Sequence, residues 1–277
     1  MATTGELSRE RLCDVEGRLL SSPVLAANGA KVYICGRSKD KLDRASETHG
    51  QDARGEIISL QADITTKKDI ASLCDEMKSR EEYLSILVNN AGISGETFPV
   101  TENKSAEDWK KSLFDNEKAT FEDWVNVYRT NVAATYFTTV AMLPLLQACT
   151  ERHPGWSATV INVTSISGLV KTSQHHFSYN ASKAAAIHLT RMLASDIAAT
   201  GLKIRVNSIA PGVFPSEMTA GESDKAQKSK LETERYQGKV PVYRPGKASA
   251  VLFTAGNQYL NGQTITVDGG YTLAAGL

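Results

Sequence analysis

Short apolar runs alternate along the chain with longer stretches whose apolar residues recur at helical spacing. The runs that predict β-strands cover residues 30–36, 56–63, 84–92, 158–165, 203–211 and 263–270. The stretches that predict helices cover residues 38–48, 66–80, 121–149 and 177–199. Strands that alternate with helices are typical of a mostly parallel sheet with helices on both faces. Because no repeat or linker divides the pattern, we predict a single α/β domain over residues 1–277.

Three polar segments lie outside this alternation. Residues 1–16 are polar and mixed in charge, which predicts a tail and no secretory signal. Residues 96–120 form a charged connection with some helical character, which we interpret as a solvated excursion. The alternative is that this connection helps to cover the substrate or to contact another subunit. Residues 213–245 are polar and rich in charge, which suits a mobile lid over a substrate.

The charge balance narrows the classes of partner. The chain has 31 basic and 31 acidic side chains, so no electrostatic attraction to nucleic acid or to an anionic membrane is expected. No continuous apolar run approaches the roughly 18 to 20 residues of a membrane helix. We therefore expect a cytoplasmic protein. Its four cysteines lack the spacing of a zinc site and are expected to be reduced thiols, at Cys13, Cys35, Cys74 and Cys149.

A tyrosine and a lysine with complementary chemistry lie near the start of a predicted helix. Tyr179 and Lys183 are four residues apart in the sequence YNASK, so their side chains share one helix face. A phenol has a reference pKa of about 10, and a nearby ammonium lowers that pKa because it stabilises the phenolate. Such a pair can pass a proton to or from a substrate oxygen. The spacing alone is a weak signal, so the neighbouring motifs decide.

Polar residues close two of the predicted strands. Ser165 ends the strand VINVTS, and Asn90 lies in NNAG at the end of another strand. Ligands of open parallel sheets bind at this carboxyl edge. A hydroxyl there can hydrogen-bond the same substrate oxygen as Tyr179, which favours Ser165 over the alternative Ser167. Asn90 is interpreted as a ligand contact, with a simple turn residue as the alternative.

Two histidines, His175 and His176, precede the helix that begins with the tyrosine motif. A metal site would need further ligands, and none lies at suitable spacing, so no metal is expected. The histidines either line the entrance for the substrate or are simply exposed.

Taken together, the motifs resemble the short-chain dehydrogenase/reductase family. The features that carry the resemblance, in the family's order, are NNAG, Asn131 in YRTNV, Ser165, YNASK, RVNSIAPG and NGQTITVDGG. They cover about residues 26 to 272, and the closing segment and the 96–120 excursion look most like fungal members, many of them from secondary-metabolite pathways. The resemblance implies a doubly wound, Rossmann-like sheet of seven strands and a homodimer or homotetramer. It also implies hydride transfer between a nicotinamide cofactor and a small carbonyl or alcohol substrate.

The resemblance assigns a role to each matching residue. It implies that Tyr179 is the acid/base, that Lys183 lowers its pKa and holds the nicotinamide ribose, and that Ser165 orients the substrate oxygen. It implies that Asn131 holds a water in the proton relay. The cofactor contacts that it implies are Asp63 at the adenine, Asn90 at the adenosine-side ribose, and Pro211, Gly212, Val213 and Ser216 around the nicotinamide. Arg129 is either a further contact or a solvated helix residue.

The end of the predicted strand at 30–36, which is the second strand in the family's order, bears on the choice of cofactor. NAD enzymes place an acidic residue there to bind the ribose hydroxyls. Here the position is Gly36, followed by Arg37 and Ser38. No carboxylate would repel a 2′-phosphate, and a guanidinium is well shaped to bind one. We therefore expect NADP rather than NAD; the alternative is that Arg37 is only a surface charge.

The segment before that strand departs from the family pattern. Family members carry T-G-x-x-x-G-x-G there, whose backbone N–H groups reach the pyrophosphate at a helix N-terminus. Here the chain runs from Gly17 and Arg18 through LLSSPV to LAANGA, without those glycines. A parallel crossover needs about a dozen residues, and only about ten separate Leu20 from Lys31. We therefore expect the chain to form a shortened first strand or a shortened first helix, but not both of these elements.

Three interpretations follow from the missing loop. The chain is an NADP-dependent oxidoreductase with a degenerate phosphate loop, a catalytically impaired partner subunit of an active homologue, or a misassembled gene product. The intact Tyr179, Lys183 and Ser165 fit the first and third interpretations better than the second. We take oxidoreductase chemistry as the function and expect weak cofactor binding.

Overall fold

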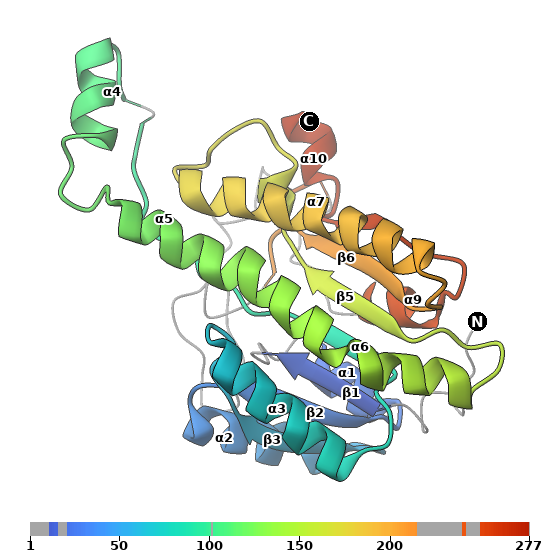
Figure 1. The fold of residues 1–277 in the computed structure, drawn as a ribbon. Helices are drawn as coiled ribbons and strands as arrows, with labels where there is room; N and C mark the ends of the chain where they lie inside the picture. The colour runs from blue at the N-terminus through green and yellow to red at the C-terminus, as the bar shows by residue number, and fades with distance from the viewer. Residues whose placement is uncertain (1–10, 16–20, 101, 215–239, 242–249, 277) are drawn as a thin grey trace.

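The computed structural model describes residues 11–15, 21–100, 102–214, 240–241 and 250–276. These residues form a seven-stranded sheet in which every neighbouring pair is parallel (Figure 1). In sheet order the strands are β3 (Glu56–Gln61), β2 (Lys31–Gly36), β1 (Arg11–Val15), β4 (Ile86–Asn89), β5 (Thr159–Val163), β6 (Arg205–Pro211) and β7 (Thr264–Val267). The predicted doubly wound α/β fold is therefore confirmed.

Helices cover both faces of the sheet, because strands such as β2 and β4 bury consecutive side chains and therefore bury both of their faces. The helices of one face are α1 (Ser22–Ala27), α2 (Lys39–Gly50) and α9 (Ala250–Gly256). Those of the other face are α3 (Lys67–Arg80), α6 (Ala134–Arg152) and α7 (Phe177–Ala199). Strand β2 shows the alternation: Val32 and Ile34 pack on the first face, and Tyr33 and Cys35 on the second.

The first strand and the first helix both form, so the expectation that the chain supplies only one of them was wrong. Strand β1 has five residues and lies inside the segment predicted to be a polar tail. It pairs with β2 from Arg11↔Lys31 to Val15↔Cys35, and with β4 on its other side. Because the strand ends at Val15, residues 16–30 are left for the crossover, which satisfies the length that a parallel connection needs. Helix α1 has six residues and begins with a proline, which favours a helix start.

The predicted helix at 121–149 is present as one long helix with a π-helical segment inside it. It comprises α5 (Phe121–Tyr128), the π-helix η2 (Arg129–Ala133) and α6. By length and composition the span Phe121–Arg152 could cross a membrane, contrary to the expectation that no segment qualifies. The window is 44% buried, and α6 packs against α3 and the sheet. We interpret it as a core helix of a globular domain.

The charged excursion at 96–120 contains a helix, as its sequence predicts. Helix α4 (Ala106–Leu113) begins with a capping box between Ser105 and Asp108 and buries none of its residues. It stands away from the body of the molecule (Figure 1). Trp109 and Phe114 are 44% and 79% exposed on this excursion.

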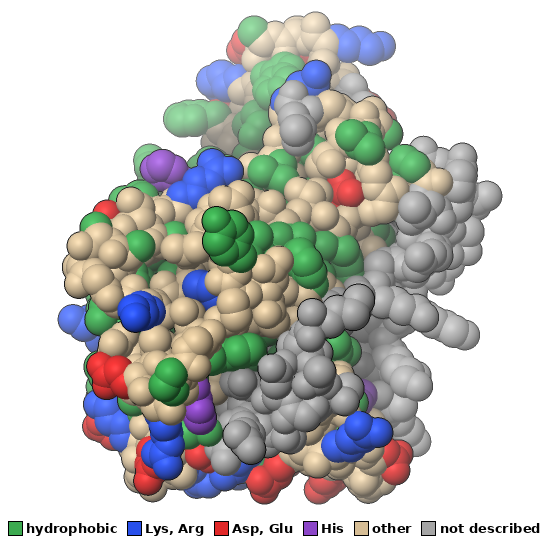
Figure 2. Space-filling view, turned by 90° about the vertical axis from the view of Figure 1, so that its right-hand side faces the viewer, with side chains coloured by type: hydrophobic (Ala, Val, Ile, Leu, Met, Phe, Trp, Pro, Cys, Tyr) green, Lys and Arg blue, Asp and Glu red, His purple; other side chains and the backbone are tan. Residues whose placement is uncertain are grey.

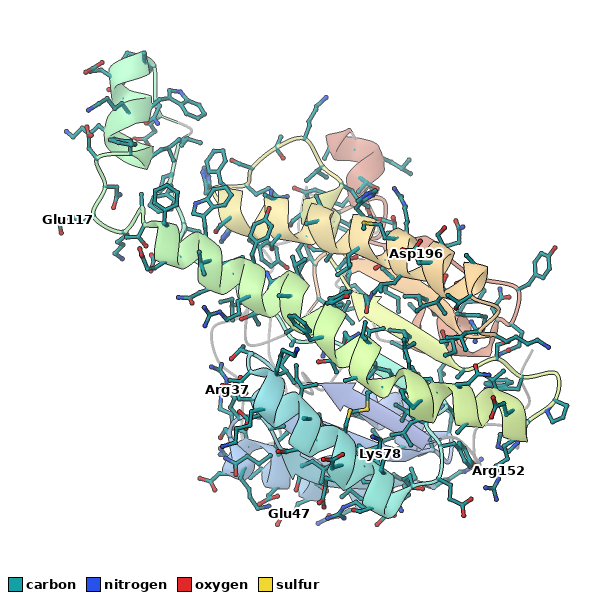
Figure 3. All side chains as sticks on the ribbon, viewed as in Figure 1. Arg37, Glu47, Lys78, Glu117, Arg152 and Asp196 are labelled. Carbon is teal, nitrogen blue, oxygen red and sulfur yellow. The ribbon has the colours of Figure 1, made fainter. Side chains whose placement is uncertain are left out.

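The amino ends and the carboxyl ends of the strands lie at opposite sides of the molecule (Figure 1). At the amino ends of the strands, basic and acidic side chains are interspersed (Figure 2). There Lys31 and the Tyr33 hydroxyl both contact the carboxylate of Glu81, each at 2.6 Å. Arg37 lies at the opposite side of the molecule, beside the carboxyl ends of the strands (Figure 3). The candidate site residues gather at that carboxyl edge.

Candidate active site

The tyrosine and lysine of YNASK lie on the first turns of α7, close to the carboxyl end of β5. The Lys183 ammonium is 5.7 Å from the centroid of the Tyr179 ring. It is almost fully buried and donates a hydrogen bond of 2.9 Å to the carbonyl of Val163, the last residue of β5. A buried ammonium needs such an acceptor, because an unpaired buried charge is costly. The bond therefore fixes the start of α7 against the strand end that leads to Ser165.

Ser165 begins the 3₁₀-helix η3 (Ile166–Gly168), directly after β5. Its side-chain oxygen accepts a hydrogen bond of 3.1 Å from the Ser167 backbone N–H. A hydroxyl that accepts this bond keeps its own proton to donate to a ligand oxygen. The Ser167 hydroxyl instead donates to the side-chain oxygen of Gln174 at 3.0 Å. These contacts favour Ser165 over Ser167 as the residue that faces the substrate.

Asn131 lies in the π-helix η2, a feature that is frequent at functional sites. Its side-chain oxygen accepts from the Ile93 N–H at 2.9 Å, and its amide nitrogen donates to the Ile93 carbonyl at 3.0 Å. The same nitrogen donates to the Ser182 hydroxyl at 2.9 Å. The side chain thus holds the loop after β4 against α7, while its role in holding a water stays a prediction.

Gly92 of NNAG packs against both the lysine and the asparagine of the site. A Cβ atom at this position would lie 3.3 Å from the Asn131 side-chain oxygen and 3.3 Å from the Lys183 ammonium. Such contacts are tighter than ordinary van der Waals distances. The missing side chain therefore lets the loop after β4 approach the Lys183–Asn131 pair, with Asn90 buried beside it.

Removal of the Asn131 side chain is expected to lower the stability of the domain. The variant Asn131→Ala leaves the Ile93 N–H and the Ile93 carbonyl without their partner, so we expect a loss of about 1–3 kcal/mol in the free energy of unfolding. Urea denaturation followed by circular dichroism measures this change. Asn126→Ala is the matched control, because Asn126 is exposed on the adjoining α5. The control should leave stability unchanged or slightly raised, since alanine is the better helix former. Equal effects of the two variants on stability would contradict the conclusion that Asn131 holds the loop after β4.

The residues predicted to bind the adenosine end of the cofactor lie after β2 and β3. Arg37 and Ser38 are exposed, and Ser38 precedes α2 in an extended conformation without a side-chain cap bond. Asp63 accepts from the Thr65 hydroxyl at 2.7 Å and from the Thr65 N–H at 2.9 Å. These bonds, first that of the hydroxyl, together with the nearby Arg37 charge, hold the pKa of Asp63 below its usual range. An exposed guanidinium and a helix N-terminus there suit a phosphate group.

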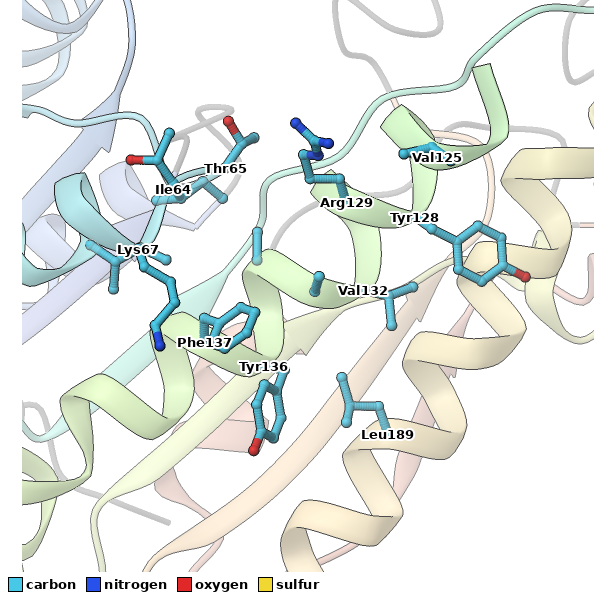
Figure 4. A pocket seen from close by; sticks show the side chains of 14 residues that line it. Ile64, Thr65, Lys67, Val125, Tyr128, Arg129, Val132, Tyr136, Phe137 and Leu189 are labelled. Atoms are coloured by element: carbon cyan, nitrogen blue, oxygen red, sulfur yellow. The ribbon is translucent and has the colours of Figure 1, made fainter. Parts of the chain in front are cut away.

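Arg129 lies at the first position of η2 and is exposed. It lines a pocket of about 650 Å³ with Ile64, Thr65 and Lys67, which follow Asp63 in the chain (Figure 4). The structure thus places Arg129 near the adenine side of the candidate site, and both of its predicted roles remain open.

The nicotinamide side of the predicted site is only partly described. Pro211 ends β6, and the Gly212 N–H donates to the Val267 carbonyl at 3.0 Å. A Cβ atom at Gly212 would come within 2.8 Å of the backbone of Asp268, so glycine is required there. Val213 is half-buried next to it. Ser216 and most of the predicted lid at 213–245 lie outside the described residues.

The histidines lie beside the tyrosine. The His176 ring is 6.3 Å from the Tyr179 ring, and burial, followed by the charge of His175, lowers the pKa of His176. His175 contacts the segment after β4 and is described further below. In the described part of the chain no three His, Cys, Asp or Glu side chains are grouped to hold a metal. Cys35, Cys74 and Cys149 are buried and are not joined in disulfides.

These observations can be compared with known proteins. A model of the family described as short chain dehydrogenase matches residues 20–227. The chain belongs to the short-chain dehydrogenase/reductase family. Members of the family are oxidoreductases that act on CH–OH and C=O groups and bind nicotinamide cofactors.

Relatives within the family include fungal and bacterial proteins. The chain is 35% identical over 262 residues to the short-chain dehydrogenase/reductase PhomF′ of Diaporthe leptostromiformis, covering 91% of this chain and 86% of the relative. It is 30% identical over 264 residues to the rhamnolipids biosynthesis 3-oxoacyl-[acyl-carrier-protein] reductase of Pseudomonas aeruginosa, covering 93% and 92%. The structure of the Pseudomonas aeruginosa RhlG/NADP active-site complex is similar, with a TM-score of 0.76, 26% identity, and coverage of 98% of this chain and 99% of that chain.

The sequence had pointed to most of this site and missed two of its parts. The family motifs gave Tyr179, Lys183, Ser165 and Asn131, which lie on neighbouring elements of the carboxyl edge. The close packing of Gly92 was missed, although its place in NNAG was a signal. The hydrogen bond between the Ser167 hydroxyl and the Gln174 side chain left no signal in the sequence.

Proposed function

We propose that this protein is an NADP-dependent oxidoreductase that reduces a carbonyl group of a small substrate in the cytoplasm. The observation that carries the proposal is the anchoring of Lys183 to the end of β5. This one hydrogen bond holds the lysine, the tyrosine one turn before it and the serine two residues after the strand in a single site. The arrangement has the parts that a proton transfer to a carbonyl oxygen requires.

The residues divide the chemistry between them. A nicotinamide held by Lys183 would supply the hydride that the carbonyl carbon accepts. Tyr179 gives its hydroxyl proton to the carbonyl oxygen, so that the C=O group becomes CH–OH. Ser165 donates a hydrogen bond to the same oxygen, where negative charge develops. The Lys183 ammonium favours the phenolate that Tyr179 becomes, because opposite charges stabilise each other.

The preference for NADP rests on the end of β2. Arg37 and Ser38 are exposed there, at the N-terminus of the 12-residue helix α2. A guanidinium binds a 2′-phosphate through charge-assisted hydrogen bonds, and the helix dipole adds to the attraction. The similarity to a protein whose structure was solved as a complex with NADP supports the same choice.

Loss of the Arg37 guanidinium should therefore weaken the binding of NADPH and leave the binding of NADH nearly unchanged. A charge-assisted hydrogen bond contributes about 1.5–3 kcal/mol, so Arg37→Ala is expected to raise the Kd of NADPH by roughly 10- to 100-fold. The Kd of NADH should change by less than about twofold, since NADH has no 2′-phosphate. Fluorescence titration of the nicotinamide measures both constants. Arg44→Ala removes an exposed guanidinium of α2 that donates to the Asp40 carbonyl, and should change neither constant. A parallel loss for both cofactors would contradict the assignment of Arg37.

The substrate class is proposed from the relatives. One is named as a 3-oxoacyl-[acyl-carrier-protein] reductase, and others are fungal short-chain dehydrogenases/reductases. We propose a ketone in fungal secondary metabolism, such as a polyketide or terpenoid intermediate, and we use acetoacetyl-CoA as a soluble 3-oxo probe.

Transfer of deuterium tests the proposed reaction directly. The purified protein is incubated with NADPH that carries deuterium at the transferable position and with acetoacetyl-CoA and a panel of simpler ketones. Mass spectrometry of the alcohol products is expected to find one deuterium on the carbinol carbon. Absence of any deuterated alcohol across the panel, in a protein that melts cooperatively, would count against the reductase.

A non-catalytic partner subunit is the second candidate. It is favoured by the segment before β2, where α1 has only six residues, begins at the buried Ser21 and Ser22 and lacks the glycines of the family loop. Exposed apolar side chains on the long helix, including Val125, Tyr136 and Phe137, suit contact with a second subunit. Light scattering after size exclusion distinguishes a homodimer or homotetramer from a monomer.

A further inference from the structure

A strained turn lies between the serine and the tyrosine of the candidate active site. Gln174 and His175 have φ angles of 52° and 69°, and they are the non-glycine residues of the described chain that adopt positive φ. A non-glycine residue in this conformation is strained and persists only where the surrounding structure holds it. Strain of this kind is concentrated at functional sites, so the contacts that hold this turn are informative.

Two segments from distant parts of the chain hold the turn. The Phe98 N–H donates to the His175 carbonyl at 2.9 Å, which joins the turn to the base of the 96–120 excursion. The Gln174 amide nitrogen donates to the Tyr271 hydroxyl at 2.8 Å, which joins the turn to the C-terminal helix α10 (Tyr271–Ala275). The turn is therefore fixed from both sides.

The other end of the Gln174 side chain leads to the catalytic serine. Its oxygen accepts from the Ser167 hydroxyl at 3.0 Å, and the backbone N–H of the same serine donates to the Ser165 side chain at 3.1 Å. A chain of three hydrogen bonds thus joins Tyr271 to Ser165 through Gln174 and Ser167. Among the described residues, the Gln174 side chain makes no hydrogen bond besides these two.

The C-terminal end of the chain of bonds is itself fixed. The Asp268 carboxylate accepts from the Thr272 N–H at 2.7 Å and from the Gly270 N–H at 2.9 Å, directly at the start of α10. Gly212, which follows β6, packs against the backbone of Asp268. Tyr271 is consequently held at a defined place relative to the nicotinamide side of the site.

We infer that Gln174 is a positioning residue, which fixes the hydroxyl of Ser165 relative to α10 through its hydrogen bonds. The inference rests on the proposed reductase function, in which Ser165 hydrogen-bonds the substrate oxygen. Gln174 needs no contact with substrate or cofactor for this role, because it acts through Ser167 and Ser165. A donor that is displaced by as little as about 1 Å can lose much of its effect on the transition state.

Kinetics of paired variants test whether Gln174 acts through Ser165. Gln174→Met keeps the length of the side chain and removes both hydrogen bonds. We expect it to lower kcat for acetoacetyl-CoA about tenfold, with KM and the Kd of NADPH changed less than about twofold. In a Ser165→Ala background the same substitution should cause no further loss, because the group that it positions is gone. An equal loss in both backgrounds would overturn the inference.

Two further variants sharpen the test. Gln174→Glu keeps an acceptor for Ser167 and can accept from the Tyr271 hydroxyl, so it should recover most of the activity that Gln174→Met loses. Tyr271→Phe removes only the hydroxyl and should reproduce part of the loss in kcat. Tyr259→Phe is its control, because the Tyr259 side chain is fully exposed. If Tyr271→Phe behaves as this control does, the link to α10 is contradicted.

Hydrogen exchange provides a readout that needs no turnover. The amides of Gly168 and Leu169 are hydrogen-bonded within η3 and report on the loop of Ser165. We expect Tyr271→Phe to increase exchange at these amides as well as in α10. An increase confined to α10 would overturn the coupling. A wild-type protein without turnover would count against the proposed function, and the exchange result would still decide the inference.

Discussion

Replacement of Tyr179 by phenylalanine is expected to lower kcat by about 10²- to 10⁴-fold, the range that a positioned proton donor contributes. The variant loses the one proton that the carbonyl oxygen requires, while the Lys183–Val163 bond is independent of the hydroxyl. The Kd of NADPH should therefore change by less than about threefold, which is below 1 kcal/mol. Steady-state reduction of acetoacetyl-CoA and a fluorescence titration measure the two quantities.

Tyr259→Phe is the matched control for this loss. It deletes the same hydroxyl from a fully exposed side chain, so its kcat should equal that of the wild type. If Tyr179→Phe retained a third or more of the wild-type rate, the proton would come from another group. His176 is the neighbour that would then be examined, since its ring lies 6.3 Å from the Tyr179 ring.

Restoration of a glycine-rich loop is expected to increase cofactor affinity at least tenfold. In this variant a T-G-x-x-x-G-x-G segment with a full first helical turn replaces Gly17 to Ser22. The backbone N–H groups of this segment would bind the pyrophosphate at the N-terminus of a longer helix. In the wild type the corresponding helix α1 has only six residues. Titration with NADPH compares the Kd of the variant with that of the wild type.

The insertion needs a control for length and for folding. A flexible insertion of the same length, made only of serine and asparagine, should leave the affinity for NADPH unchanged or lower. Both variants should melt cooperatively, since the replacement leaves the paired residues of β1 and β2 unchanged. If the glycine-rich and the control insertions bound NADPH equally, the missing loop would not be what limits binding.

Most of the fold follows from local pattern. The strands and helices predicted from residue 30 onward lie within about three residues of their places in the structure, because each of these strands is a short run that contains Ile together with Val or Leu. Strand β1 was missed because RLCDV is short and contains two charged residues. Only pairing with β2 and β4 on either side shows that it is a central strand.

The proposed catalytic pair could be found from sequence because its spacing is local. Tyr179 and Lys183 share a helix face, and the family motifs gave the context. The bridge of Gln174 could not be found in this way, since its partner Tyr271 is 97 residues further along the chain. The hydrogen bonds of Arg205 could not be predicted for the same reason, because their acceptors are distant in the sequence. Its buried guanidinium donates to carbonyls at the end of α9, among them Ala255 at 2.8 Å.

The measurement that tests the central claim most directly is a titration of the wild-type protein with NADPH and NADH. Nicotinamide fluorescence and the melting temperature are followed together, and Arg37→Ala is included. We expect saturable binding of NADPH that raises the melting temperature, with NADPH bound more tightly than NADH and this difference lost in Arg37→Ala. A cooperative melt that neither cofactor shifts, with no change in nicotinamide fluorescence, would contradict the assignment of this chain as an NADP-dependent oxidoreductase.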